Sequence, residues 1–298
     1  MAEGISRMEI AICIGANGTE SDRLLKSLLK NASPLRSAGI AIPGPSRYRQ
    51  PMREALDAEA QGKGGPRSRE VVLQAALDGE ADRLVMVMDN FMAIPRGLVQ
   101  SGVFYPKLEN RLRGLGRIFR EDRVELFLAI RHPAAFLQEV ASLAKADLSS
   151  VLGIARPDDL RWSDLVRRIR SSQPGMGLTV WCQEDAPLLW ERILRGTTGA
   201  AAELPVKGRL DLLSGVLDPE GMKALEHAVA QMPAEAGVAL HEAVADLWEV
   251  HAMDGAAREE ITAPELPPEV VAALSRSYEA DLAAIDAMEG VQLLLPFR

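Results

Sequence analysis

The sequence predicts an α/β fold, in which helices cover both faces of a mostly parallel sheet. Short runs rich in valine, isoleucine and leucine alternate with longer stretches whose apolar residues recur at helical spacing. The short runs are nearly continuous in apolar residues, which is typical of strands buried on both faces of a parallel sheet. Turn-forming residues follow most of these runs, as the strand–loop–helix order of such a fold requires.

The first elements follow from this pattern. A strand is expected at 9–15 and a helix at 21–38, which Gly39 ends. An extended piece at 39–45 closes in proline and glycine, and a glycine-rich loop at 62–66 separates the next two helices. Those helices are expected at 52–60 and 67–78, and the next strand at 83–88.

The alternation continues through the middle of the chain. Pro133 and Pro187 each follow a predicted strand, and proline suits the first turn of a helix. Strands are expected at 124–130 and 178–182, with helices at 107–119, 133–146, 162–171 and 187–195.

The pattern changes near residue 200. Helices are expected at 219–232, 234–253 and 268–288, with a charged, proline-containing linker at 256–268 and a last apolar run at 291–295. The sequence therefore predicts an α/β core over residues 1–200 and a helical C-terminal portion over residues 201–298, packed on the same domain.

Bulk properties exclude several classes of protein. The net charge of −8 argues against nucleic acid as a partner. The sequence contains no apolar run long enough to span a membrane and no segment that resembles a signal peptide. Cys13 and Cys182 fall in predicted strands, so we expect reduced core thiols and a cytoplasmic protein.

The junction between the first strand and the first helix is the main candidate site. Backbone N–H groups and a helix dipole at such a loop can hold phosphate. The loop has no Gly-Lys-[Ser/Thr] and no Gly-x-Gly-x-x-Gly, which disfavours an ATPase or a dinucleotide enzyme. The candidate binding residues in this loop are Gly15, Asn17, Gly18, Thr19 and Ser21.

These motifs resemble those of the bacterial sulfotransferase-like proteins of the P-loop superfamily. The opening Ile14–Thr19, the leucine-rich helix after it and Gly39–Pro43 are similar to the family's first segment. The run Leu126–Pro133 is similar to the family's strand that ends in Arg-x-Pro, and 179–185 and 277–282 also resemble family segments. The resemblance implies a sulfuryl donor, 3′-phosphoadenosine 5′-phosphosulfate, and a hydroxyl acceptor such as a saccharide. It also implies that Arg131 contacts the donor's 3′-phosphate.

The chain departs from that family where charge matters. The family loop usually reads Gly-x-His-Lys-Thr-Gly-Thr-Thr, and the resemblance places Asn17 at the histidine and Gly18 at the lysine. Glu20, Ser21 and Asp22 replace the glycine and the two threonines, and Glu139 replaces the serine that accompanies the arginine. Unit charges about 4 Å apart repel by roughly 4 kcal/mol at an effective dielectric near 20. We therefore expect a degenerate donor site, in which catalysis is reduced or absent.

The acidic residues of the loop also have a simpler interpretation. Thr19, Ser21 and Asp22 all favour the start of a helix, where negative charge complements the dipole. Arg131 either holds an anion or pairs with one of the carboxylates of Glu20, Asp22 and Glu139.

Asp89 is a candidate general base, because it follows the strand expected at 83–88. The alternative is that Asp89 and Asn90 simply form a turn. The four histidines do not have the spacing of a zinc site, so we expect no metal centre.

Three functional hypotheses follow. The first is the degenerate sulfotransferase, with the donor nucleotide bound weakly or not at all. The second is an active transferase that takes its cation from Arg23, Lys26 or Arg47, with 47–49 as a loop folding over the site. The third is a non-catalytic binding or scaffold module whose apolar C-terminal helices form a homodimer contact.

Overall fold

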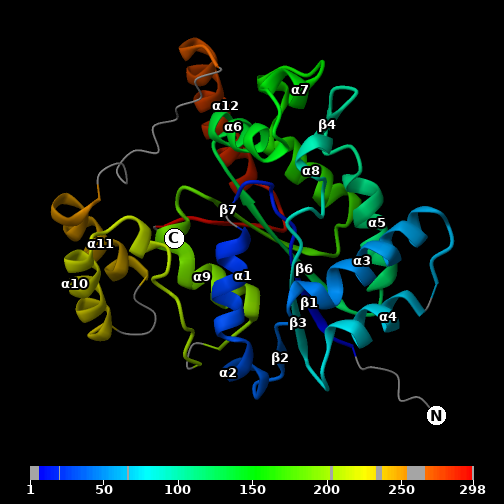
Figure 1. The fold of residues 1–298 in the computed structure, drawn as a ribbon, viewed down its shortest axis with the longest axis horizontal. Coiled ribbons are helices and arrows are strands. Elements are labelled where there is room, and N and C mark those ends of the chain that lie inside the picture. Colours follow the sequence, from blue (N-terminus) through cyan, green and yellow to red (C-terminus); the bar gives the residue numbers. More distant parts are fainter. Residues whose placement is uncertain are drawn as a thin grey trace.

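The computed structural model describes residues 7–19, 21–65, 67–201, 204–232, 237–253 and 266–296. Its centre is a six-stranded sheet in the order β2-β3-β1-β6-β7-β8, in which every neighbouring pair is parallel (Figure 1). The strands of this sheet are β1 (Glu9–Cys13), β2 (Ile40–Ala41), β3 (Arg83–Val87), β6 (Arg123–Ile130), β7 (Gly177–Cys182) and β8 (Val291–Leu294). The predicted α/β fold is confirmed.

Helices cover both faces of the sheet, and the alternation along β1 shows how. Ile10, Ile12 and Ile14 enter the larger core cluster, whereas Ala11 and Cys13 enter the cluster on the opposite face. The larger cluster lies under α3 (Pro45–Ala60), α4 (Arg67–Ala76), α5 (Leu108–Ile118), α6 (Pro133–Ala144), α7 (Leu148–Leu152), α8 (Trp162–Ser172) and α12 (Pro268–Asp286). The opposite cluster lies under α1 (Ser21–Lys30), α2 (Ala32–Arg36) and α9 (Ala186–Thr198).

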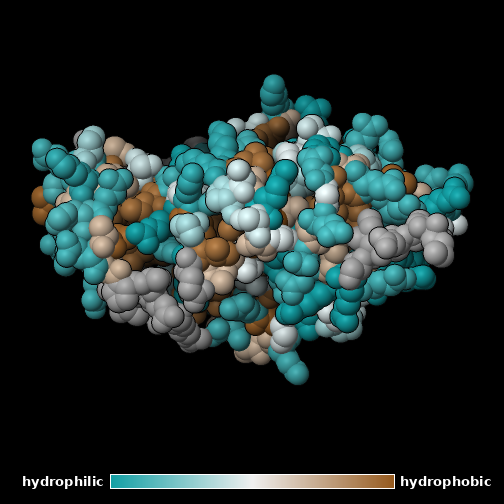
Figure 2. All heavy atoms as spheres, turned by 90° about the horizontal axis from the view of Figure 1, so that it is seen from below, coloured by the Kyte–Doolittle hydropathy of each residue, from teal (hydrophilic) through white to brown (hydrophobic). Residues whose placement is uncertain are grey.

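The C-terminal portion has two parts. α10 (Pro219–Ala230) and α11 (Gly237–His251) pack on each other around a small core of their own and form one end of the molecule (Figure 1). α12 packs on α6 and α8, and the chain then returns to the sheet as β8. The face in Figure 2 is mainly hydrophilic, with hydrophobic patches between the α10–α11 end, at left, and the body of the molecule.

Two local predictions are wrong. The helix expected at 21–38 is two helices, because the Asn31 side chain at the break donates to Ser27 O and accepts from Lys207 N. The segment 47–49 is not a loop, since α3 already begins at Pro45.

Some elements have no counterpart in the prediction. These are the short hairpin of β4 (Val99–Gln100) and β5 (Val103–Phe104), the helix α7, and three single turns of 3₁₀ helix. No helix in the described ranges is both long and apolar enough to cross a membrane.

Candidate functional site

The candidate residues meet at the carboxyl ends of the central strands. β1 leads into α1 on one face of the sheet, and its neighbour β6 leads into α6 on the other face. Such a change of face is where open α/β sheets bind ligands. The structure places the loop after β1 and Arg131 after β6 at this point, and Asp89 follows β3 on the other side of β1.

The first part of the loop continues the sheet instead of arching away from it. Ile14 N donates to Phe127 O at 2.9 Å, and Ala16 N donates to Ala129 O at 2.8 Å. In return Ala129 N donates to Gly15 O at 2.9 Å. The amides of Ile14 and Ala16 are therefore used by β6 and are not presented to a ligand.

Asn17 is a buried structural residue, of which 4% is exposed. Its Nδ2 donates to Asn90 Oδ1 and to Ala93 O, both at 3.0 Å. Its Oδ1 accepts from Tyr105 Oη at 2.9 Å, and burial raises the pKa of that tyrosine. Asn17 thus joins the loop to the segment after β3, and its polar atoms already have protein partners.

Gly18 lies between Arg131 and Glu139. Its carbonyl oxygen accepts from Arg131 Nη1 at 3.1 Å. A Cβ built on Gly18 would lie 2.5 Å from Glu139 Cγ, and the φ angle of +70° is one that residues with a side chain rarely adopt. The space beside Gly18 is therefore filled by Glu139, and the arginine contacts a carbonyl of the loop itself.

The end of the loop forms the start of a helix. Thr19 is buried, and its Oγ1 donates to Ala16 O at 2.7 Å. Ser21 is the first residue of α1, and Asp22 is exposed in its first turn, where a carboxylate complements the dipole. Glu20 lies outside the described residues.

Asp89 forms an ion pair with Arg49, which the sequence analysis expected in a loop and the structure places in α3. Arg49 Nη2, from α3, lies 2.8 Å from Asp89 Oδ1. Arg47, one of the cations considered from the sequence, instead donates to Ala75 O, Leu77 O and Asp78. Because Arg49 occupies one oxygen of this carboxylate, the geometry favours an ion-pair role for Asp89 over that of a general base.

A second polar cluster lies beyond β6 and β7. His132 Nδ1 accepts from Ala134 N at 3.3 Å, so Nε2 carries the proton and donates to Ser275 Oγ at 3.0 Å. Ser275 Oγ in turn donates to Val271 O. His132 and Ser275 therefore cap α6 and link it to α12. His132 presents an N–H to Ser275 instead of the acceptor nitrogen that would activate a serine nucleophile.

Glu184 connects the same elements. Its Oε1 accepts from His132 N at 2.5 Å and its Oε2 accepts from Tyr278 Oη at 3.1 Å. Burial, and then the charge of Glu184, raise the pKa of Tyr278. This carboxylate links the end of β6, the turn before α9 and α12, and nothing in the local sequence pattern indicates it.

The two cysteines are buried, as expected. Burial raises the pKa of both Cys13 and Cys182 to about 12. We predict that a disulfide reagent near pH 8 labels neither thiol in the native protein and labels both after unfolding in urea. At that pH a thiol of pKa about 12 is ionised to only ~10⁻⁴. Rapid labelling of either thiol in native conditions contradicts this prediction.

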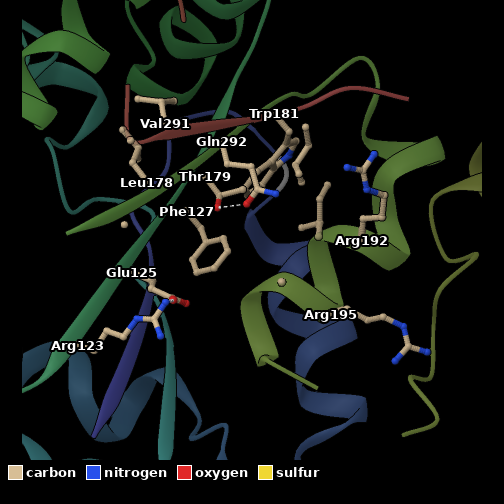
Figure 3. Close-up of a pocket in the computed structure, with 15 residues that line it drawn as sticks. Arg123, Glu125, Phe127, Leu178, Thr179, Trp181, Arg192, Arg195, Val291 and Gln292 are labelled. Atoms are coloured by element: carbon tan, nitrogen blue, oxygen red, sulfur yellow. Dashed lines mark hydrogen bonds and ion pairs between the residues drawn. The ribbon is translucent and has the colours of Figure 1, made fainter. Parts of the chain in front are cut away.

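No group of three metal-ligating side chains forms among the residues that the structure describes. A hollow of about 600 Å³ lies away from the loop, on one face of β6, β7 and β8 (Figure 3). No family model matches the chain, and neither curated proteins nor solved structures give a match.

Proposed function

We propose that this chain is a sulfotransferase-like protein of the P-loop superfamily whose donor loop is degenerate. In this proposal sulfuryl transfer is reduced or lost. The parallel strand order and the loop between β1 and α1 are consistent with the resemblance drawn from the motifs. The surroundings of Gly18 carry the argument against an active donor site.

A sulfuryl donor needs positive charge and hydrogen-bond donors at the loop. At Gly18 the backbone presents a carbonyl oxygen to Arg131, and the place of the family's lysine side chain is filled by Glu139. The amides of Ile14 and Ala16 are already bonded to β6. These groups do not suit the phosphates of 3′-phosphoadenosine 5′-phosphosulfate.

Titration with adenosine 3′,5′-bisphosphate in a calorimeter tests the proposal. At physiological salt we expect no measurable binding, which corresponds to a dissociation constant above about 1 mM. Micromolar binding that is lost in an Arg131→Ala variant would overturn the proposal, because it would show a working phosphate site.

The position of Arg49 favours a second candidate, an active transferase with an unusual cation. Arg49 reaches Asp89 at the carboxyl end of β3, next to the Asn90 side chain that holds Asn17. A sulfuryl-transfer assay over hydroxylated saccharides and lipids separates the two candidates. Turnover that falls in an Arg49→Ala variant supports the transferase, and no turnover across the panel supports the degenerate site.

A further inference from the structure

The sheet ends on one side in a strand with an unprotected edge. In a parallel strand, backbone groups that point to one neighbour alternate with groups that point the other way. β8 pairs with β7 on one side, and within the described ranges no strand pairs with its other side. The opposite edge, β2, has only two residues, which is one way proteins protect an edge.

The sequence of β8 contains none of the other protective features. Val291–Leu294 reads Val-Gln-Leu-Leu, without charge or proline. Its alternate residues Val291 and Leu293 pack toward the larger core, whereas Gln292 is exposed. An edge strand without charge, proline or a covering strand can pair with another strand, and four residues give β8 twice the length of β2.

The sheet face beside this edge is also open. α9 packs mainly over β1 and β3, which leaves the face of β7 and β8 as the floor of the hollow (Figure 3). On this floor Thr179 Oγ1 donates to Gln292 Oε1 at 3.4 Å. Phe127 and Trp181 line the same hollow, so its floor is of mixed polarity.

Opposite charges lie at the two ends of β8, an exposed carboxylate at one end and a half-buried arginine at the other. Glu289 is exposed just before the strand, where the half-buried Arg170 is bonded to Met176 O. At the other end Arg192 Nη1, from α9, donates to Leu295 O at 2.7 Å. A two-fold axis that places two such strands antiparallel brings Glu289 of each copy opposite Arg192 of the other.

We propose that two copies of this chain associate through β8, in antiparallel register, so that the two sheets become continuous. The outward backbone groups of each strand bond to the other strand, and the charges at the strand ends pair. Because the axis is perpendicular to the sheet, both hollows open on the same face and join into one groove between the two α9 helices. The inference does not depend on the proposed function.

Light scattering after size-exclusion chromatography, and sedimentation equilibrium, test the proposal with the full chain. We expect a dimer at micromolar concentration and at least a roughly tenfold weaker dimer for Gln292→Lys, because like charges then lie across the new strand pair. Thr179→Lys is the matched control: it places the same charge in the same hollow but one strand further in, and should leave the dimer intact.

Charge reversal at the ends of β8 provides a second measurement, in which the double variant is the internal control. Glu289→Arg and Arg192→Glu should each weaken the dimer, and the double variant should recover most of the loss. A monomer at all concentrations overturns the proposal. So does a dimer that Gln292→Lys leaves unchanged, which would place the contact elsewhere, for example on α10 and α11.

Discussion

Asp281→Ala is expected to destabilise the protein by about 3–5 kcal/mol, since a buried carboxylate with several donors is removed. The Asp281 side chain is 1% exposed. It accepts from Trp162 N at 2.9 Å, from Ser163 Oγ at 2.5 Å and from the Arg161 guanidinium at 2.8 Å. Without this carboxylate, the buried N–H of Trp162 loses its acceptor and Arg161 loses its ion pair with Asp281. The start of α8 is then no longer hydrogen-bonded to α12.

Urea unfolding followed by circular dichroism measures this loss. Glu279→Gln is the control, because Glu279 lies on the same helix but is exposed, and its change should stay within about 0.5 kcal/mol. A loss below about 1 kcal/mol for Asp281→Ala would mean that water replaces the carboxylate, contrary to the burial described here.

Much of the fold could be predicted from local pattern. The strands β1, β3, β6 and β7 are nearly continuous apolar runs, and each is found within two residues of its predicted position. The hairpin of β4 and β5 could not be predicted, because two-residue strands carry no period. The sequence pattern places the start of α3 at residue 52 instead of Pro45, because the first turn is polar and the apolar face becomes regular only from Tyr48 onward.

The positions of the candidate residues in the fold could be predicted, but their contacts could not. The structure places Gly15–Thr19, Asp89 and Arg131 at the carboxyl ends of β1, β3 and β6, and the strand–loop–helix pattern of the sequence predicts those positions. The bonds of Asn17 to Tyr105 and of Asp89 to Arg49 join residues far apart in the chain. Such pairings depend on how helices and loops pack in three dimensions, and the spacing of residues along the chain does not predict that packing.

Gly18→Lys, which introduces the lysine that the proposed donor loop lacks, is expected to destabilise the protein by about 2–5 kcal/mol. Two effects add. A side chain at φ +70° costs about 1–2 kcal/mol, and the new Cβ lies 2.5 Å from Glu139 Cγ, which forces the start of the loop and α6 apart. Urea unfolding of the single variant and of Gly18→Lys combined with Glu139→Ser measures both effects, and the second substitution should recover the part due to crowding.

Gly62→Lys separates the backbone effect from the crowding. Gly62 has nearly the same φ, +68°, and a Cβ built there has nothing within 4 Å. We therefore expect a loss of only about 1–2 kcal/mol for this variant, and no further change when Glu139→Ser is added to it. If Gly18→Lys lowers the free energy of unfolding no more than Gly62→Lys does, the Glu139 side chain moves aside readily and the loop has room for a lysine. That result would remove the main support for a degenerate donor site, because a lysine at position 18 would then fit without changes in the residues around it.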